Sequence, residues 1–285
     1  MNYLQCLNGI TNFDESKQIL KDKNLVVKEY DDLYLIKYNK NECDMNDSDV
    51  QKCRGLILEK NTNNLVAVPP RKSDNIISFN KINVDLTHFE EFVDGTMITI
   101  FKYKGKVYIS TRSCLGGLCY FYSTKSFYDL FNEVIDIENL EVIDDSMILT
   151  FILQHPENII VTKYKTPSIK LVYGCSIENN TISYYKLDEL KTVLENKGLS
   201  FEIPKKFPVN NVSEVYAYLK NMDQNEQGII MKYIENNVYL RGKVRNEFYN
   251  YVRNLKGNSN NKKFMYLQLK QNKNLDEYLK YFSED

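Results

Sequence analysis

The amino-acid sequence predicts an α+β fold built on antiparallel sheets. Short runs rich in Val, Ile, Leu and Tyr recur along the chain, and tight turns with Asn, Asp or Gly join them, which is typical of antiparallel hairpins. Helical patterns stand between groups of strands rather than after every strand, which is unlike a parallel α/β sheet. The chain has 285 residues, 43% of them hydrophobic, and can therefore bury one large core and a small appendage.

The N-terminal part predicts one helix followed by two hairpins. The helix lies within residues 7–24 and has a capping residue at Asn12 or Asp14. Pro69 and the proline after it end the last strand, because proline cannot continue a ladder. The predicted hairpins pair residues 25–30 with 33–38 and residues 53–59 with 65–68.

The middle of the chain predicts further strands around one short helix. Residues 93–101 and 106–111 alternate well enough to pair across a Lys104–Gly105 turn. Residues 123–132 predict the short helix. Three more strands are expected, at residues 147–153, 159–164 and 169–177.

The last third predicts helices around one more hairpin. A helix at 188–196 stops at Gly198, and a second helix spans 212–222 with Ser213 as its cap. The hairpin pairs residues 228–233 with 237–242, and the chain beyond is helical in two pieces, broken at residues 256–261. We therefore expect a main domain at residues 1–245 and a small helical C-terminal extension at 246–285.

The composition excludes several classes of protein. The net charge of −1 gives no overall basic field, so any surface for nucleic acid must be local. The six cysteines form no C-x-x-C pair and the chain has two histidines, so no metal site is predicted. No apolar run is long enough to span a membrane, and no secretory leader is recognised. The thiols are expected to be reduced and the protein cytoplasmic.

One stretch, residues 91–96, organises the functional prediction. It reads E-F-V-D-G-T and precedes a predicted strand. Other segments accompany it in a fixed order: C-R-G-L-I at 53–57, S-F-N-K at 78–81, S-T-R-S at 110–113, T-F at 150–151 with H-P-E-N-I-I-V at 155–161, E-Q-G-I-I at 226–230 and K-V-R at 243–245.

Taken together, these segments resemble the phage-type RNA ligase 1 family, a branch of the covalent nucleotidyltransferases. The resemblance covers roughly residues 50–245 and rests on the order of the segments rather than on one string. It implies the nucleotidyltransferase fold of ligase adenylation domains, with antiparallel sheets around a central groove and helices at the periphery.

The resemblance also implies that the catalytic groups are missing. In the family, the lysine of a K-x-D-G motif attacks the α-phosphate of ATP, and Phe92 stands at that position and cannot form the adduct. Two family glutamates bind ribose and metal. The second matches Gln227, and the first matches Gln154, or Ile152 if the following loop is not shortened. Glutamine lacks the charge that holds Mg²⁺.

Other positions of the family pattern are retained or replaced by polar residues. Basic side chains among them can bind an RNA backbone without chemistry, although any single one is more often part of a solvated, salt-bridged surface. The expected nucleotide- or RNA-binding residues are Arg54, Asp94, Gly95, Arg112, Gln154, Gln227, Lys232, Lys243 and Arg245.

The prediction is a catalytically degenerate RNA ligase relative that binds RNA. By resemblance the RNA is tRNA-like or a cleaved tRNA, and the protein is an immunity factor against an RNA-cleaving toxin. The abundance of Asn, Lys and Ile is typical of an AT-rich genome and suits a viral or plasmid-borne element. No catalytic residue, metal or cofactor is expected.

Two alternatives stay open. The first is an active ligase that uses ATP and Mg²⁺ with a relocated lysine, such as Lys81 or Lys102, or that seals RNA adenylated by another protein. The second is a protein-binding module that inhibits a partner such as a toxin.

Two further patterns carry weaker hypotheses. Tyrosines and lysines interleave over residues 102–108 and 120–125, which is compatible with stacking of unpaired bases or with ordinary strands of a Tyr-rich chain. His155 is interpreted as a loop residue rather than a catalytic base.

Overall fold

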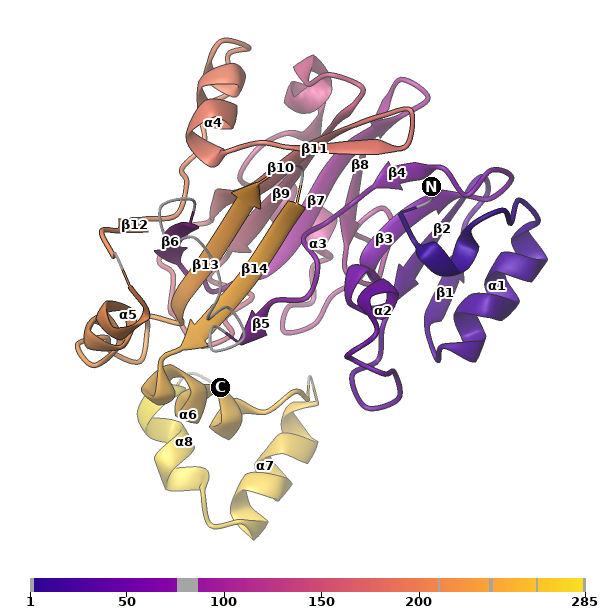
Figure 1. The fold of residues 1–285 in the computed structure, drawn as a ribbon. Helices are drawn as coiled ribbons and strands as arrows, with labels where there is room; N and C mark the ends of the chain where they lie inside the picture. The colour runs from indigo at the N-terminus through magenta and orange to yellow at the C-terminus, as the bar shows by residue number, and fades with distance from the viewer. Residues whose placement is uncertain (1–2, 76–86, 210, 236–237, 260, 284–285) are drawn as a thin grey trace.

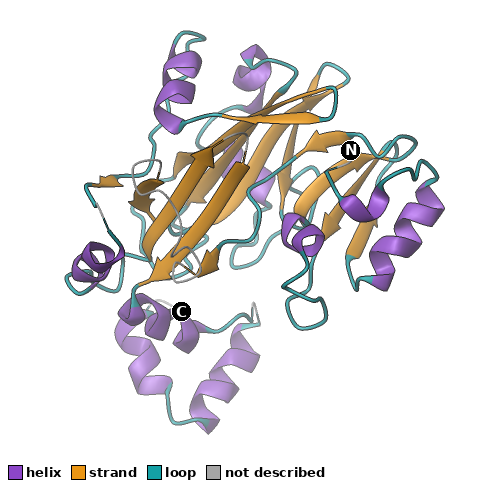
Figure 2. Cartoon of the chain, viewed as in Figure 1, coloured by secondary structure: helices purple, strands orange, loops and turns teal. Residues whose placement is uncertain are grey.

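The computed structural model describes residues 3–75, 87–209, 211–235, 238–259 and 261–283. Within these residues, three β-sheets form the body of the molecule and helices lie around them (Figures 1 and 2). The predicted α+β class is confirmed. The predicted hairpins at 25–38, 53–68, 93–111 and 228–242 are confirmed, and the described residues form three sheets where two were expected.

The first sheet lies near the N-terminus and is antiparallel. Asn12 caps the helix that precedes it by accepting a hydrogen bond from the backbone N–H of Glu15, so of the two predicted caps it is the one used. The strands, in spatial order, are β1 (Val26–Glu29), β2 (Leu33–Lys37), β3 (Arg54–Glu59) and β4 (Leu65–Ala67). The helices around it are η1 (Gln5–Leu7), α1 (Phe13–Asp22) and α2 (Ser48–Lys52).

The second sheet is antiparallel and has five strands. All eight residues of its central strand β9 are buried, because helices cover one face and the other sheets cover the opposite face. The strands, in spatial order, are β11 (Thr181–Tyr184), β10 (Ser168–Glu178), β9 (Met147–Gln154), β7 (Thr96–Tyr103) and β8 (Lys106–Thr111). The covering helices are α3 (Phe127–Asn132), η4 (Ile137–Val142) and α4 (Leu187–Glu195).

The third sheet packs face to face against the second. Tyr239 of the third sheet meets Tyr173 of the second edge-on, with 5.2 Å between ring centroids. The strands, in spatial order, are β12 (Lys206–Phe207), β6 (Thr87–Glu91), β13 (Gly228–Glu235), β14 (Val238–Arg245) and β5 (Asp74–Asn75), the last of which runs parallel to β14. Helix α5 (Val212–Leu219) packs on this sheet, and its cap is Asn211 rather than the predicted Ser213.

Three helices follow the third sheet and form a separate apolar cluster below the ends of β13 and β14 (Figure 1). They are α6 (Glu247–Lys256), α7 (Lys262–Gln271) and α8 (Leu275–Tyr281). The predicted single helix after the break is two helices, because Lys273 adopts a left-handed conformation with φ 58°. The division of the chain at residue 246 stays a prediction.

One predicted strand is absent. Residues 159–164 form a loop, and β9 pairs with β10 instead. The backbone groups of the loop bond to side chains: the N–H groups of Val161 and Thr162 donate to Asp94, and the Ile159 carbonyl accepts from Lys256. A backbone satisfied in this way needs no strand partner. No helix among the described residues is long and apolar enough to cross a membrane.

Candidate functional site

The loop between β6 and β7 carries the E-F-V-D-G-T stretch and is held tightly by its neighbours. The backbone N–H of Phe92 donates to the carbonyl of Gly228 at 2.9 Å, which ties the loop to the start of β13. Gly95 has φ +139°, and a Cβ there would collide with the carbonyl oxygen of Leu153. Only glycine fits this close approach of two backbones.

Asp94 is the centre of this loop. Its Oδ2 accepts from the backbone N–H groups of Val161 (3.1 Å) and Thr162 (2.9 Å). Its Oδ1 accepts from the Tyr249 hydroxyl of α6 at 2.7 Å and from the N–H of Gly95 at 3.0 Å. Burial, followed by the Asp94 carboxylate, raises the pKa of Tyr249 far above its ordinary value, so the phenol stays a donor. Both carboxylate oxygens are therefore engaged in holding the fold.

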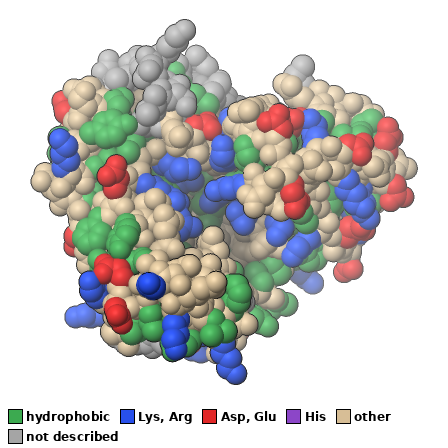
Figure 3. Space-filling model, turned by 90° about the horizontal axis from the view of Figure 1, so that it is seen from below, with side chains coloured by type: hydrophobic (Ala, Val, Ile, Leu, Met, Phe, Trp, Pro, Cys, Tyr) green, Lys and Arg blue, Asp and Glu red, His purple; other side chains and the backbone are tan. Residues whose placement is uncertain are grey.

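A cavity of about 200 Å³ opens beside this loop, and we call it the basic cavity. Figure 3 shows Lys and Arg side chains gathered in a hollow of the surface seen from below. Among the described residues, the one carboxylate in its lining is Asp94, which is already saturated. The eight cations that line it are Lys40, Arg54, Lys72, Arg112, Arg241, Lys243, Arg245 and Arg253.

The cations of the basic cavity are crowded and incompletely paired. Arg241 is 7% exposed, and its Nε has no hydrogen-bond partner among the described residues; the same holds for Nε of Arg245. Burial, followed by Arg245 and Lys40, lowers the pKa of Lys243 to about 8. Burial, followed by Arg241, lowers the pKa of Arg54 to about 10. These cations are partly removed from water and repel one another, and a bound anion would offset both effects. The cavity is therefore a candidate anion site.

Phe92 stands between the basic cavity and a second cavity of about 380 Å³. Phe92, Asp94 and Gln227 line both cavities, so they form the partition. The Phe92 ring is half-buried, and the Arg245 guanidinium lies over it, 5.5 Å from the ring centroid. An aromatic face attracts such a cation, and it offers no lone pair for attack on a phosphate.

Gln154 lies in the second cavity and is used by the fold. Its amide nitrogen donates to the carbonyl of Asp94 at 3.4 Å, and its amide oxygen accepts from the Ser168 hydroxyl at 3.1 Å. A carboxylate could not donate the first of these bonds. The glutamine therefore suits this position structurally, and Ile152, the alternative match, lines the basic cavity instead.

The structure brings most of the predicted site residues together. Those that line the basic cavity are Arg54, Asp94, Gly95, Arg112, Gln227, Lys243 and Arg245. Lys232 is a correction, because it is 6% exposed and lies outside both cavities. Its amine bonds to the Glu90 carboxylate at 2.5 Å and the Val172 carbonyl at 2.7 Å, so it is a cation balanced inside the sheets.

Of the two candidates for a relocated lysine, the structure describes Lys102. Lys102 is 3.3 Å from Asp145 and outside both cavities, and Lys81 lies outside the described residues. His155 is 1% exposed; it bonds to Glu133 through Nε2 and accepts from the Glu157 N–H through Nδ1, as a structural residue does.

The interleaved tyrosines and lysines do not form one surface. Lys104 pairs with Asp32, and Lys125 pairs with Glu133 and Glu157. Tyr103 and Tyr108 pack on the core, whereas Tyr120 and Phe121 are exposed. Tyr103 and Tyr108 are therefore ordinary strand residues rather than a surface for stacking bases.

Four cations of the basic cavity were not predicted: Lys40, Lys72, Arg241 and Arg253. One of them had a signal in the sequence. Arg241, Lys243 and Arg245 alternate along β14 and so share one face of the sheet. Arg253 comes from α6, and no spacing links that helix to the strand.

Of the described residues that line the basic cavity, Asp94 is the one carboxylate, and both of its oxygens already accept hydrogen bonds. Among the described residues, no three His, Cys, Asp or Glu side chains group closely enough to hold a metal. The Asp94 oxygens are engaged, and Gln154 and Gln227 offer amide oxygens where Mg²⁺ prefers carboxylates. The cations fit phosphate groups, which arginine binds well.

Known proteins share part of their sequence or their fold with this chain. No protein-family model matches the chain. It is 27% identical over 242 residues to a protein of Autographa californica nuclear polyhedrosis virus described as a bifunctional polynucleotide kinase/RNA ligase. The match covers 76% of this chain and 33% of the viral protein, so the chain spans about a third of that relative.

Two solved structures share the fold. A protein from Aquifex aeolicus described as an ATP-dependent DNA ligase superposes with a TM-score of 0.58 at 17% identity, over 93% of this chain and 75% of that one. An archaeal ATP-dependent RNA ligase superposes with a TM-score of 0.58 at 14% identity, over 85% of this chain and 63% of that one. The chain therefore has the nucleotidyltransferase fold of the ATP-dependent ligases and is RNA ligase-like in sequence.

Proposed function

We propose that this protein binds RNA in the basic cavity and has lost the ability to form a lysyl-AMP intermediate. The observation that carries the proposal is the composition of the cavity: eight cations, one saturated carboxylate, and Phe92 and Gln227 in its wall. Such a lining favours a polyanion and supplies neither a nucleophile at position 92 nor ligands for Mg²⁺. The viral relative described as a polynucleotide kinase/RNA ligase supports RNA as the polyanion.

The finer identity of the RNA rests on analogy. Relatives in the RNA ligase 1 family act on cleaved tRNA, so we propose a tRNA-like or cleaved tRNA ligand and a role in immunity against an RNA-cleaving toxin. A set of nicked, intact and unrelated RNAs of equal length tests this. Equal affinity for all three would reject the tRNA part and leave the RNA binding standing.

RNA binding itself is tested with Arg241→Met and Lys243→Gln. Each removes a cation of the basic cavity, so each is expected to weaken binding of single-stranded RNA by about tenfold and to flatten its salt dependence. Lys191→Gln on α4 is the matched control, since Lys191 is partly exposed, pairs with Glu195 and does not line the cavity. Equal affinities for all of these variants would reject the proposal.

One observation favours a second function, an active nucleotidyltransferase that uses Lys243. Its pKa of about 8 leaves part of the amine neutral near neutral pH, as a nucleophile requires. In that reaction the amine would attack the α-phosphorus of ATP, the bond to pyrophosphate would break, and the amine would lose a proton.

Labelled ATP with Mg²⁺ or Mn²⁺ separates the two functions. We expect no covalent AMP adduct from the native chain, nor from Phe92→Lys, because the acids that would hold the metal are absent in both. An adduct that disappears in Lys243→Arg would establish the second function and overturn the first.

A further inference from the structure

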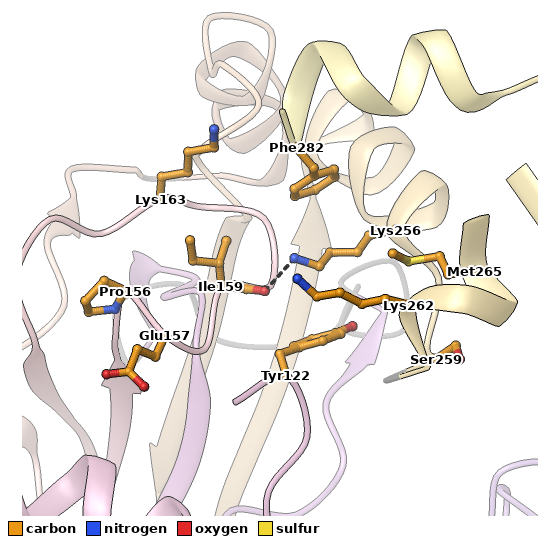
Figure 4. Close-up of a pocket in the computed structure, with 10 residues that line it drawn as sticks. All are labelled: Tyr122, Pro156, Glu157, Ile159, Lys163, Lys256, Ser259, Lys262, Met265 and Phe282. Carbon is orange, nitrogen blue, oxygen red and sulfur yellow. Dashed lines mark hydrogen bonds between the residues drawn. The ribbon is translucent and has the colours of Figure 1, made fainter. Parts of the chain in front are cut away.

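A third cavity, of about 230 Å³, lies on the other side of the loop that Asp94 holds. It opens between Tyr122, the loop at residues 156–163 and the C-terminal helices, and we call it the α6–α8 pocket (Figure 4). Its walls are mixed in character. The apolar part consists of Pro156, Ile159, Met265 and Phe282, and the cations are Lys163, Lys256 and Lys262. Glu157 also lines the pocket, and its carboxylate is paired with Lys125 at 2.6 Å.

A buried cation forms one wall of this pocket. Lys256 is 5% exposed, and its amine donates to the Ile159 carbonyl at 2.9 Å. The same amine lies 4.8 Å from the ring centroid of Tyr122 and 4.4 Å from that of Phe282. Figure 4 shows the side chain of Lys262 extending toward the same part of the pocket, above the Tyr122 ring. Two ammonium groups that converge beside apolar walls favour an anion that also carries an apolar part.

The pocket adjoins the basic cavity through shared elements. Helix α6 lines both, with Tyr249 and Arg253 facing the basic cavity and Lys256 facing the pocket. In the loop, Ile160 lines the basic cavity and its neighbour Ile159 lines the pocket. Arg253 and Lys256 of the same helix therefore place one cation at each of the two cavities.

We propose that the α6–α8 pocket holds one unpaired nucleotide of the RNA strand whose backbone lies in the basic cavity. The proposal rests on the proposed function and extends it. The volume of about 230 Å³ is below the range of pockets for drug-sized ligands, so the occupant that we propose is a single nucleotide rather than a longer stretch of RNA. Lys256 and Lys262 meet the phosphate, and the apolar walls meet the base, in the manner of single-stranded RNA sites.

The test compares a dinucleotide, chosen to be too short to reach from the basic cavity into the pocket, with a single-stranded RNA of about 12 nucleotides. Lys262→Glu is expected to weaken binding of the longer RNA by about tenfold and to leave the shorter one unchanged. Lys263→Glu is the matched control, because it makes the same charge change on the next residue of α7 and does not line the pocket. An abasic site moved along the longer RNA should weaken binding at one position by about tenfold in the native chain.

The outcomes separate this inference from the proposed function. If Lys262→Glu and Lys263→Glu bind the longer RNA equally while Arg241→Met binds it more weakly, the pocket inference is overturned and RNA binding in the basic cavity stands. If Arg241→Met also binds normally, both fail. If Lys262→Glu abolishes capture of a protein partner and not of RNA, the pocket serves a protein and the inference is overturned.

Discussion

Two buried cations, Lys232 on β13 and Arg241 on β14, lie directly opposite each other in the third sheet and differ in how their charge is balanced. They are 6% and 7% exposed. The amine of Lys232 has the Glu90 carboxylate and a backbone carbonyl as partners, whereas Nε of Arg241 has none among the described residues. One charge is balanced within the fold and the other faces a cavity of further cations. Burial alone does not distinguish a structural cation from a binding one; the partners do.

The largest change in stability is expected when Lys232 loses its carboxylate partner, Glu90. Glu90→Gln leaves Lys232 charged and buried without a carboxylate, so we expect the free energy of unfolding to fall by about 3–5 kcal/mol. Urea denaturation measures it. Glu91→Gln is the adjacent control, because its pair with Lys170 is partly exposed, and a loss of under about 1 kcal/mol is expected there. Equal losses at the two positions would contradict the comparison.

Removal of Arg241, the cation that faces the basic cavity, is expected to raise the free energy of unfolding. Arg241→Met removes a buried charge that lacks a full set of partners and keeps much of the side-chain volume, so the free energy of unfolding should rise by about 1 kcal/mol. The same variant should bind RNA more weakly, which would be a gain of stability at the cost of function. A clear fall in the free energy of unfolding would contradict this expectation, because it would mean that other groups of the protein already stabilise the Arg241 charge.

The last expected effect concerns pH. The folded pKa of Lys243, about 8, lies below the value of about 10.4 for an unfolded lysine, so the unfolded chain binds more protons between these values. Stability should therefore rise from about pH 8 to about pH 10, and this rise should be absent in Lys243→Met. RNA affinity should change in the other direction, falling by up to about tenfold above pH 8 as the ammonium is lost. Lys243→Arg keeps its charge and should show a flat affinity over this range.

Much of the fold could be predicted because hairpins are local. The runs around the turns of β1–β2, β3–β4 and β7–β8 carry their own pairing signal in Asn, Asp and Gly. The predicted strand at 159–164 failed because two side chains distant in sequence, Asp94 and Lys256, bond to its backbone. Apolar pattern alone cannot reveal a partner of that kind.

The site could be predicted where the family order of segments constrained it, as at Arg54, Gln227 and Lys243. Arg241 could have been found from its alternation with Lys243, since a strand places every second residue on one face. Lys232 was assigned to the site wrongly, because the sequence does not show that Glu90 on β6 neutralises it. Arg253 reaches the cavity through the packing of α6, which only the three-dimensional fold specifies.

The saturation of Asp94 has a consequence for how such chains are recognised by motif. The V-D-G part of the stretch serves the architecture, since Asp94 closes the loop at 161–162 and Gly95 fits against β9. The side chain at position 92 makes none of these hydrogen bonds. A search that scores the aspartate and glycine of this motif therefore detects a scaffold, and the residue two places before the aspartate must be inspected before a reaction is assigned.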